Sequence, residues 1–426
     1  MEISIEMQES LRDAVLKNIE VHKIEDLTND RPHMVAEMNR ILERVIEQHN
    51  IYLTAQNQLQ MAELMADEII GFGPLRSLLE DDTVSDILVN GPEHIFIERF
   101  GKLERTPLRF INNNQLTDIA KRLVQRVGRR LDEGRPLVDA RLPDGSRLNV
   151  AIAPISLDGT SISIRKFGKQ SLQLTQLIES NALSNQMANL LAIAARCRVN
   201  IIISGGTGSG KTTLLNALSK YIDDNERIIT MEDAAELRLL QPHVLRMETR
   251  QAGVENTGQI SMRALLINSL RMRPDRIIVG ECRGEEAFEM LQAMNTGHDG
   301  SMSTLHANNP RDAISRLENM VMMAGMNIPM ESIRRNIASA VNIIIQVSRL
   351  NDGSRKIMNI SEVMGIEGDR IILQDIFTFQ SQNDRDENGK ITGQFISNGL
   401  LMRSVLMQNA IMFNLETELK KIFGME

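Results

Sequence analysis

The chain has 426 residues, of which 42% are hydrophobic and 24% are charged, and its formal net charge is −8. This length exceeds what one hydrophobic core usually organises, so we expect two or three domains, and the composition excludes large-scale disorder. The first residues lack the basic and apolar regions of a signal peptide, no apolar run is long enough to span a bilayer, and two cysteines give no disulfide framework. A cytoplasmic protein is therefore expected.

The first 70 residues are acidic and show helical periodicity. They hold fourteen Asp and Glu against six Lys and Arg, an excess equal to the net charge of the whole chain. Apolar residues recur every three or four positions over 11–19, 34–46 and 54–70, and the last run stops at Gly71. The sequence predicts a helical N-terminal module over residues 1–70. Its acidic face is typical of a solvated helical surface and would also suit a basic docking partner.

Between residues 71 and 167 the apolar period shortens toward two, which is typical of strands. The predicted elements are strands at 95–97, 108–110 and 148–152, hairpin corners at Gly101 and at Pro143-Asp144-Gly145, and a helix over 118–130. We expect an α+β N-terminal domain over 71–167, followed by a polar linker over 168–180.

From residue 181 to residue 426 short apolar runs alternate with helical patterns. The runs at 199–203, 227–231 and 276–279 predict strands, and further strands are predicted at 341–347 and 371–379 before a helical pattern returns from Leu400. This alternation is typical of a parallel sheet covered by helices, so the predicted fold class is α/β, with a C-terminal extension.

One glycine-rich segment carries the strongest functional signal. Residues 201–213 read IIISGGTGSGKTT and match the pattern G-x-x-x-x-G-K-[ST] between an apolar strand and a helical run. Successive backbone N–H groups and the helix N-terminus would converge on a phosphate, Lys211 would reach the β- and γ-phosphates, and Thr212 would place its hydroxyl on Mg²⁺. The residues predicted to bind ATP are Gly205, Gly206, Thr207, Gly208, Ser209, Gly210, Lys211, Thr212 and Thr213.

Acidic residues end two of the predicted strands that follow this loop. Glu232, Asp233 and Glu236 follow the first strand, and Glu281 follows the second. Because ligands of open α/β sheets bind at the carboxyl edge, these side chains are candidates for holding Mg²⁺ or activating water. Gly280 stands where many P-loop proteins have an aspartate, so Glu281 would act alone or through water.

The stretch NTGHDGSMSTLHAN, residues 295–308, places two histidines among small residues. Zinc would need three or four ligands at short spacing, whereas seven residues separate His298 from His306 and Cys282 is the nearest thiol. A Ser-His-Asp hydrolase would need a nucleophile elbow, and the only such pattern nearby lies inside the phosphate loop. The residues themselves leave open structural histidines or a sensor of some other group in the chain.

Together these blocks resemble the type II/type IV secretion ATPase superfamily, and specifically its tight-adherence (Flp/Tad-type) pilus assembly branch. The resemblance rests on the phosphate loop, TMEDAAEL, RMRPDRIIVGECRGEEAFEMLQAMNTGHDGSMSTLHANNPRDAISRLENM and the upstream DGSRLNVAIAPISLDGTSISIRKF, and it covers residues from about 71 to 380. It implies a RecA-like P-loop core that follows the α+β domain in the chain. It also implies a homo-hexameric ring ATPase that uses ATP and Mg²⁺ and lies peripheral to the inner membrane. There it would work with inner-membrane platform proteins, and pilin would be its indirect substrate.

The same resemblance implies roles for individual residues. Lys211 and Thr212 fall in the Walker A element, Glu232, Asp233 and Glu236 in the aspartate box, Glu281 in the Walker B element, and His298 and His306 in the histidine box. Arg147 and Arg165 match the arginines by which the N-terminal domain of this family reaches the nucleotide phosphates. The predicted catalytic residues are Glu281, Glu236, Lys211, Arg147, Arg165, His298 and His306, and the predicted metal ligands are Thr212 and Glu281.

Two other functions stay open from the sequence. A nucleotide-gated scaffold would assemble on binding ATP and barely hydrolyse it, and a DNA-pumping conjugation ATPase would be a relative of the pilus motors. Residues 121–147 hold eight Lys and Arg against four Asp and Glu, but no aromatic residue interleaves them, and the whole chain has no Trp and two Tyr. Stacking platforms for bases are therefore scarce, and no direct nucleic-acid contact is expected.

Overall fold

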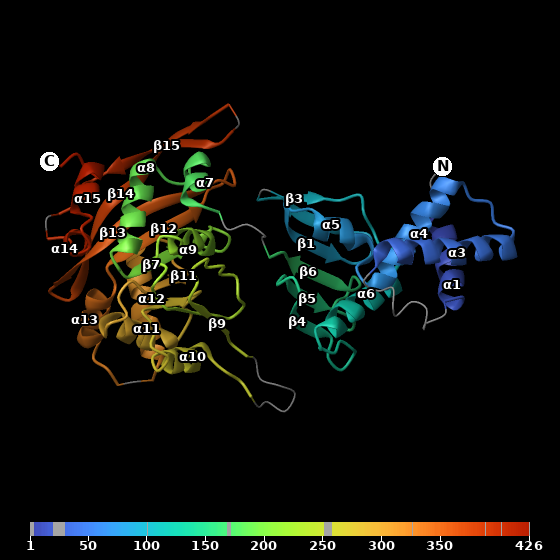
Figure 1. Cartoon of the computed structure of the whole chain (residues 1–426), viewed down its shortest axis with the longest axis horizontal. Helices are drawn as coiled ribbons and strands as arrows, with labels where there is room; N and C mark the ends of the chain where they lie inside the picture. The colour runs from blue at the N-terminus through green and yellow to red at the C-terminus, as the bar shows by residue number, and fades with distance from the viewer. Residues whose placement is uncertain are drawn as a thin grey trace. The chain divides into compact units, whose positions relative to one another are not determined.

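The computed structural model describes residues 4–19, 30–99, 101–167, 172–250, 258–325, 327–387, 389–401 and 403–425. The chain divides into two compact units, Met1–Lys169 and Gln170–Glu426 (Figure 1). Residues 20–29 of the predicted helical module and 168–171 of the predicted linker lie outside the described residues. The rest of that linker contains helix α7 (Leu174–Glu179), whose Leu174 is buried in the core of the second unit. Within the described ranges, no helix combines the length and apolar character needed to cross a membrane.

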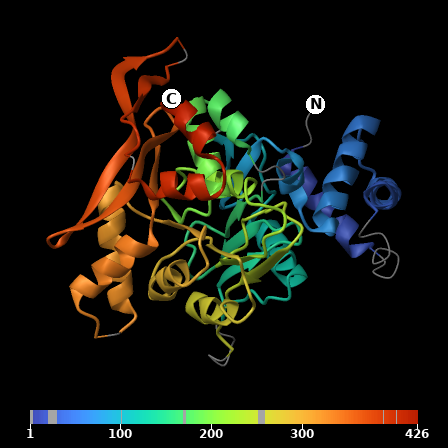
Figure 2. The same cartoon turned by 60° about the vertical axis from the view of Figure 1, so that its left-hand side comes forward.

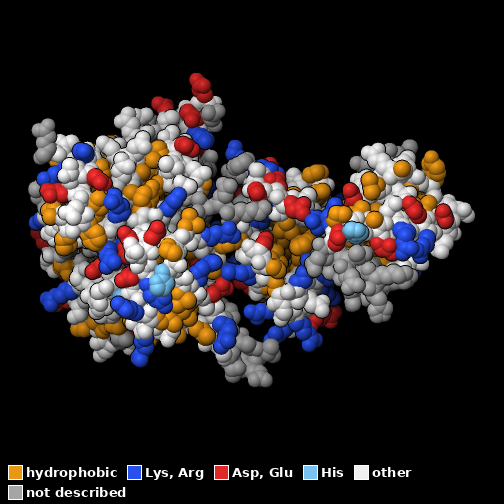
Figure 3. Space-filling view, in the orientation of Figure 1, with side chains coloured by type: hydrophobic (Ala, Val, Ile, Leu, Met, Phe, Trp, Pro, Cys, Tyr) orange, Lys and Arg blue, Asp and Glu red, His pale blue; other side chains and the backbone are white. Residues whose placement is uncertain are grey.

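Three helices open the first unit: α1 (Ile5–Lys17), α3 (Arg31–His49) and α4 (Ala55–Ile70). Their apolar faces pack into one core, as the sequence periodicity predicts. Ser4, Asp30 and Thr54 cap the three N-termini through side-chain oxygens that accept backbone N–H groups. Some apolar side chains stay at the surface of this helical part (Figure 3), including Leu59 and Leu64 of α4.

An antiparallel sheet of six strands follows, in the order β3-β2-β1-β6-β5-β4. Its strands are β1 (Val84–Asn90), β2 (Ile95–Arg99), β3 (Lys102–Arg105), β4 (Leu137–Arg141), β5 (Arg147–Ala151) and β6 (Ser161–Arg165), and its helices are η1 (Gly73–Leu75), α5 (Arg76–Glu80) and α6 (Asn113–Arg126). The predicted strands at 95–97 and 148–152 and both hairpin corners are confirmed. The predicted strand at 108–110 is wrong: Pro107 has no N–H for a ladder, and Phe110 is instead buried in the core of this domain.

A buried ion pair between two of these helices is also bonded to α6 of the sheet domain. Arg12 of α1 donates to Oε1 of Glu68 of α4 at 2.9 Å, and Gln115 of α6 donates to Oε2 of the same carboxylate at 2.5 Å. Arg122 of α6 donates to the backbone oxygen of Glu68 at 2.8 Å. Arg12, Glu68 and Gln115 are all buried. Because removal of one partner would leave a buried group uncompensated, these contacts hold α1, α4 and α6 together.

The second unit is built on a mixed sheet of nine strands, in the order β15-β14-β13-β12-β7-β11-β10-β8-β9. The strands are β7 (Ile201–Gly205), β8 (Ile228–Glu232), β9 (Val244–Glu248), β10 (Arg276–Val279), β11 (Met302–Leu305), β12 (Ile343–Arg349), β13 (Arg355–Glu367), β14 (Arg370–Arg385) and β15 (Ile391–Ser397). From β9 to β12 neighbouring strands run parallel, whereas β12 to β15 are antiparallel. The predicted α/β fold class is confirmed.

Helices cover both faces of this sheet. One core contains residues of α7, α8 (Asn185–Arg196), α9 (Lys211–Ser219), α14 (Val405–Met412) and α15 (Glu416–Ile422), and the other contains residues of α10 (Met262–Ser269), α11 (Glu286–Asn295), α12 (Pro310–Met323) and α13 (Met330–Ala340). Along β7, Ile201 and Ile203 enter the first core and Ile202 enters the second, as the alternation of a strand requires. Figure 2 shows the long strands at the C-terminal end of the sheet extending past these helices.

Candidate functional site

Four adjacent strands bring several of the predicted residues to one edge of the second sheet. Strands β7, β11, β10 and β8 are neighbours and run parallel, so their carboxyl ends meet. The phosphate loop follows β7, and His306 follows β11. Glu281 lies two residues after the end of β10, and Glu232 ends β8. We call the carboxyl ends of these four strands the phosphate-loop edge.

The phosphate loop makes a sharp turn between β7 and α9. Gly208 and Gly210 have φ angles of 69° and 99°, which side chains other than glycine rarely adopt. A Cβ on Gly205 would lie 2.3 Å from the backbone oxygen of Val347 on the neighbouring strand β12. Helix α9 begins directly after Gly210, so its unpaired N–H groups face the loop, and Thr212 and Thr213 lie half-buried in its first turn.

Lys211 is folded onto the backbone of this loop. Its Nζ donates to the carbonyl oxygens of Gly205 at 3.0 Å and Gly206 at 2.9 Å, and the side chain is buried. The hydroxyl of Ser209 also donates to the Gly206 oxygen, at 2.8 Å. The ammonium of Lys211 is therefore held inside the loop, where an anionic phosphate would compete with these neutral carbonyls.

Glu281 lies at the centre of a charged cluster. Its Oε2 accepts a 2.5 Å hydrogen bond from Arg283, whose guanidinium also lies 3.2 Å from Asp233. Its Oε1 lies 2.6 Å from Nε2 of His306, but this oxygen makes no well-angled hydrogen bond with any described residue. A shielded carboxylate oxygen that lacks a well-aligned donor is suited to a metal-bound or reacting water.

His306 is the histidine that the fold brings to the phosphate-loop edge. Burial lowers the pKa of His306, the nearby charge of Lys211 lowers it further, and Glu281 opposes both effects. The lowered pKa of His306 favours the neutral imidazole at pH 7. Gln346 of β12 donates to the backbone oxygen of Ala307 at 3.2 Å and so fixes the segment that carries the ring.

Gly280 makes room for a buried carboxylate. A Cβ at this position would lie 2.7 Å from Cγ of Glu232, whose side chain is 3% exposed. Oε1 of Glu232 accepts the N–H groups of Glu236 at 2.7 Å and Leu237 at 2.9 Å, and Oε2 has no hydrogen-bond partner among the described residues. Burial raises the pKa of Glu232 to about 7, although the two backbone N–H groups act in the opposite direction. Glu232 thus fixes the loop that carries the half-buried Glu236.

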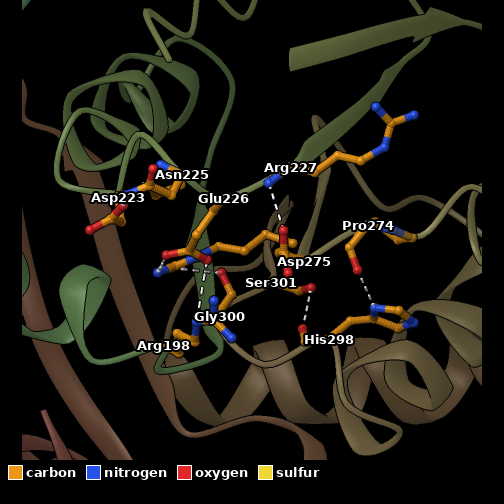
Figure 4. Close-up of polar contacts among 12 residues, drawn as sticks. Arg198, Asp223, Asn225, Glu226, Arg227, Pro274, Asp275, His298, Gly300 and Ser301 are labelled. Atoms are coloured by element: carbon orange, nitrogen blue, oxygen red, sulfur yellow. Dashed lines mark hydrogen bonds and ion pairs between the residues drawn. The ribbon is translucent and has the colours of Figure 1, made fainter. Parts of the chain in front are cut away.

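His298 lies at the opposite edge of the sheet, because it precedes β11 instead of following it. Its Nδ1 lies 3.0 Å from the backbone oxygen of Pro274, and the Ser301 hydroxyl donates to the backbone oxygen of His298 at 2.7 Å (Figure 4). The fold therefore does not bring His298 together with Lys211 and His306. The contacts it makes are those of a residue that orders a loop.

The two predicted phosphate-reaching arginines belong to the first unit. Arg147 begins β5 and Arg165 ends β6, and the antiparallel register pairs them directly. Paired residues project from the same face of a sheet, so both guanidinium groups lie on one side. Arg147 also lies 2.7 Å from Asp139 in an exposed ion pair. The role of both arginines toward a nucleotide stays a prediction.

The sequence reasoning missed three arginines around the phosphate loop. Arg283 bridges Asp233 and Glu281, and its place two residues after Glu281 was a usable signal. Arg349 and Arg355 come from β12 and β13, far along the chain, and Arg355 lies 147 residues after its hydrogen-bond partner Gly208. No local pattern marks them, because only the strand order places β12 beside β7.

A glycine-rich loop after one strand, a lysine within it and carboxylates at the ends of neighbouring strands define the P-loop class of nucleotide-binding proteins. The family model of the type II/IV secretion system protein matches residues 68–397, and the chain belongs to this family. A putative conjugal transfer protein of Mycobacterium tuberculosis is 35% identical over 311 residues, which cover 72% of this chain and 88% of that protein. The type IV secretion system protein VirB11 of Bartonella henselae is 30% identical over 340 residues, covering 70% and 93%.

The fold is also similar to that of solved structures. The X-ray structure of the ATPase DotB of Yersinia pseudotuberculosis gives a TM-score of 0.50 at 17% identity, over 82% of this chain and 85% of that one. At this identity the likeness concerns the fold alone.

Proposed function

We propose that this chain is an ATPase motor that powers the assembly of tight-adherence pilus subunits, as a hexamer at the cytoplasmic face of the inner membrane. The observation that carries the proposal is the cluster of Lys211, Glu281 and His306 at the phosphate-loop edge. Membership of the type II/IV secretion family supports a role in moving macromolecules through an envelope machine. The sequence blocks that resemble the Flp/Tad branch support a pilus as the product, with platform proteins as partners.

The residues at this edge fit ATP and Mg²⁺. The loop N–H groups and Lys211 would hold the β- and γ-phosphates, and Thr212 and Glu281 would hold the metal ion. No group of three or more His, Cys, Asp and Glu among the described residues could hold a metal by itself, which suits an ion that takes most of its ligands from phosphates and water. When bound, Mg²⁺ would neutralise charge on the phosphates.

Glu281 is the carboxylate best suited to activate water. Its Oε1 is shielded from solvent without a well-aligned donor, while Arg283 holds Oε2 in place. Glu236 is the second candidate, because Glu232 fixes the loop on which it lies. Arg147 and Arg165 remain candidates for stabilising charge on the γ-phosphate, a task that suits a planar guanidinium.

The substitution Glu281→Gln tests the role of Glu281. A glutamine keeps the size of the side chain but cannot accept a proton, so we expect unchanged ATP affinity and a turnover lower by about 10²- to 10⁴-fold. Glu367→Gln, at the exposed end of β13, is the control and should keep the wild-type rate. Equal turnover in Glu281→Gln and the wild type would remove Glu281 from the mechanism.

A DNA-translocating ATPase of conjugation is the second candidate function. The observation in its favour is that relatives in Mycobacterium tuberculosis and Rhizobium radiobacter carry the name conjugal transfer protein. ATPase stimulation by duplex DNA that falls steeply with salt would favour this function. The pilus proposal expects no such stimulation. It also expects that cells lacking the chain lose surface pili, and that the wild type but not Lys211→Ala restores them.

A further inference from the structure

We propose that Arg355 is a positioning residue for the nucleotide, which holds the phosphate loop in the shape that receives phosphate. The inference rests on the proposed function, because it concerns the same nucleotide. It adds a part of the site that comes from β13, on the antiparallel side of the sheet.

The side chain of Arg355 contacts the backbone in the middle of the phosphate loop. Its Nε donates to the carbonyl oxygen of Gly208 at 3.0 Å, and a Cβ on Gly210 would lie 3.2 Å from Cδ of Arg355. The arginine side chain therefore lies along the Gly208–Gly210 segment. Both glycines have positive φ angles, so this segment needs a fixed backbone conformation rather than side-chain packing.

The contact sets the direction of one N–H group. In a planar trans peptide the carbonyl and the N–H point in opposite directions, so a donor at Gly208 O turns the N–H of Ser209 away from Arg355. That N–H points at the carbonyl oxygen of Gly206, at 3.4 Å, and Nζ of Lys211 lies 2.9 Å from the same oxygen. Arg355 thereby directs the Ser209 N–H to the side of the loop that Lys211 occupies, where phosphate oxygens would bind.

The hairpin that carries Arg355 is itself anchored. Arg355 pairs with Arg349 across the β12–β13 ladder, and the turn between them is closed by Asp352, whose Oδ1 accepts the N–H of Ser354 at 2.9 Å. Oδ2 of Asp352 accepts the N–H of Ile391 of β15 at 2.6 Å. Nη1 of Arg349 lies 3.6 Å from the point where a Cβ on Gly208 would be, so a second guanidinium from this hairpin is close to the loop. Arg355 thus acts from a fixed base, which keeps the cost of ordering its contact low.

The test measures binding of fluorescent ATP and ADP analogues to the full chain. We expect Arg355→Ala to raise the Kd of both nucleotides by about five- to tenfold, because the charge-assisted but exposed hydrogen bond to Gly208 is lost. The value of kcat at saturating ATP should change by less than about twofold, since no group at the reacting phosphate is altered. Arg355→Lys keeps a charged donor and should recover part of the affinity.

Arg385→Ala is the matched control, because exposed Arg385 at the end of β14 also donates to a glycine carbonyl, that of Gly389 at 2.9 Å, in the connection to β15. It should bind both nucleotides as the wild type does. Unchanged affinity in Arg355→Ala, or an equal loss in Arg385→Ala, would overturn the role of Arg355 and leave the ATPase proposal intact. A wild-type chain that binds neither analogue would overturn both.

Discussion

Glu232 and Gly280 pack against each other at the phosphate-loop edge. Their packing explains why position 280 is a glycine, where many P-loop proteins have an aspartate. The side chain of Glu232 fills the space that an aspartate at position 280 would need. In return it accepts the backbone N–H groups of Glu236 and Leu237 and orders a loop with a candidate catalytic residue. Packing against Glu232 thus explains why position 280 is a glycine instead of an aspartate. Glu281, the next residue, remains as the carboxylate after β10.

A methyl group at position 280 should therefore be costly. We expect Gly280→Ala to lower the free energy of unfolding by about 1–3 kcal/mol, the usual range for overpacking, and to reduce ATP turnover because the Glu236 loop shifts. Urea denaturation and steady-state ATPase assays measure the two effects. Gly284→Ala is the control, since a Cβ there would lie in ordinary contact with Oε2 of Glu286, at 3.4 Å, instead of 2.7 Å from a neighbouring side chain. Equal losses in both variants would contradict the packing explanation.

The buried carboxyl of Glu232 also predicts a pH dependence of stability. Its pKa rises from an ordinary 4.5 to about 7, so between these values the folded chain holds a proton that the unfolded chain has lost. The free energy of unfolding therefore falls as the pH rises through this window, and the full loss of stability is reached above pH 7. Glu232→Gln cannot ionise and should gain about 1–3 kcal/mol relative to the wild type between pH 5 and pH 8, measured by urea denaturation. Parallel pH profiles for the two proteins would contradict this.

At the residue scale, the sequence indicated the types of residue at the site better than their positions. Lys211 and Glu281 lie at one edge as the order of loop and strands predicts, and His306 joins them because it follows β11, a strand that the periodicity did not predict. His298 and His306 share one motif, yet the four-residue strand β11 lies between them and sends them to opposite edges. Only the placement of that short strand distinguishes a residue near the phosphate loop from one that orders a turn.

At the scale of elements, the second sheet combines two kinds of strand with different tasks. The parallel strands carry the phosphate-loop edge, and the antiparallel strands β13 to β15 widen the sheet and bring Arg355 to the loop. The sequence periodicity predicted the parallel strands β7, β8, β10 and β12 and the N-terminal helices, because their apolar runs are short and regular, but it missed the parallel strands β9 and β11. It did not predict β13, and it marked only part of the 16-residue β14, because their partly exposed, polar stretches lack a continuous apolar signal.

A buried polar contact links the start of α14 to β13. Ser404 caps α14 by accepting the N–H of Met407, and its hydroxyl donates at 2.8 Å to Oε1 of Glu362, which is 1% exposed. Ser404→Ala removes the cap and also deprives a buried carboxyl of a donor, so we expect a loss of about 2–3 kcal/mol in urea denaturation. Ser261→Ala, which removes only the cap of α10, should cost about 1 kcal/mol. Equal losses would show that the Glu362 contact adds nothing.

At the scale of the whole molecule, the proposal needs several copies of the chain to work as a ring. The chain supplies a phosphate loop, carboxylates and a histidine in its second unit, whereas the predicted Arg147 and Arg165 belong to the first. If arginines of the first unit complete the site in an assembled hexamer, activity must depend on assembly. A scaffold that only binds ATP would show no such dependence of turnover.

The most direct test is the steady-state ATPase rate per subunit of the full chain over a range of protein concentrations, alongside Lys211→Ala and Glu281→Gln. The account predicts a rate per subunit that rises with concentration, as the ring assembles, and is lost in both variants. A negligible rate for all three proteins at every concentration, in the presence of saturating ATP and Mg²⁺, would contradict the motor and leave an ATP-gated scaffold in its place.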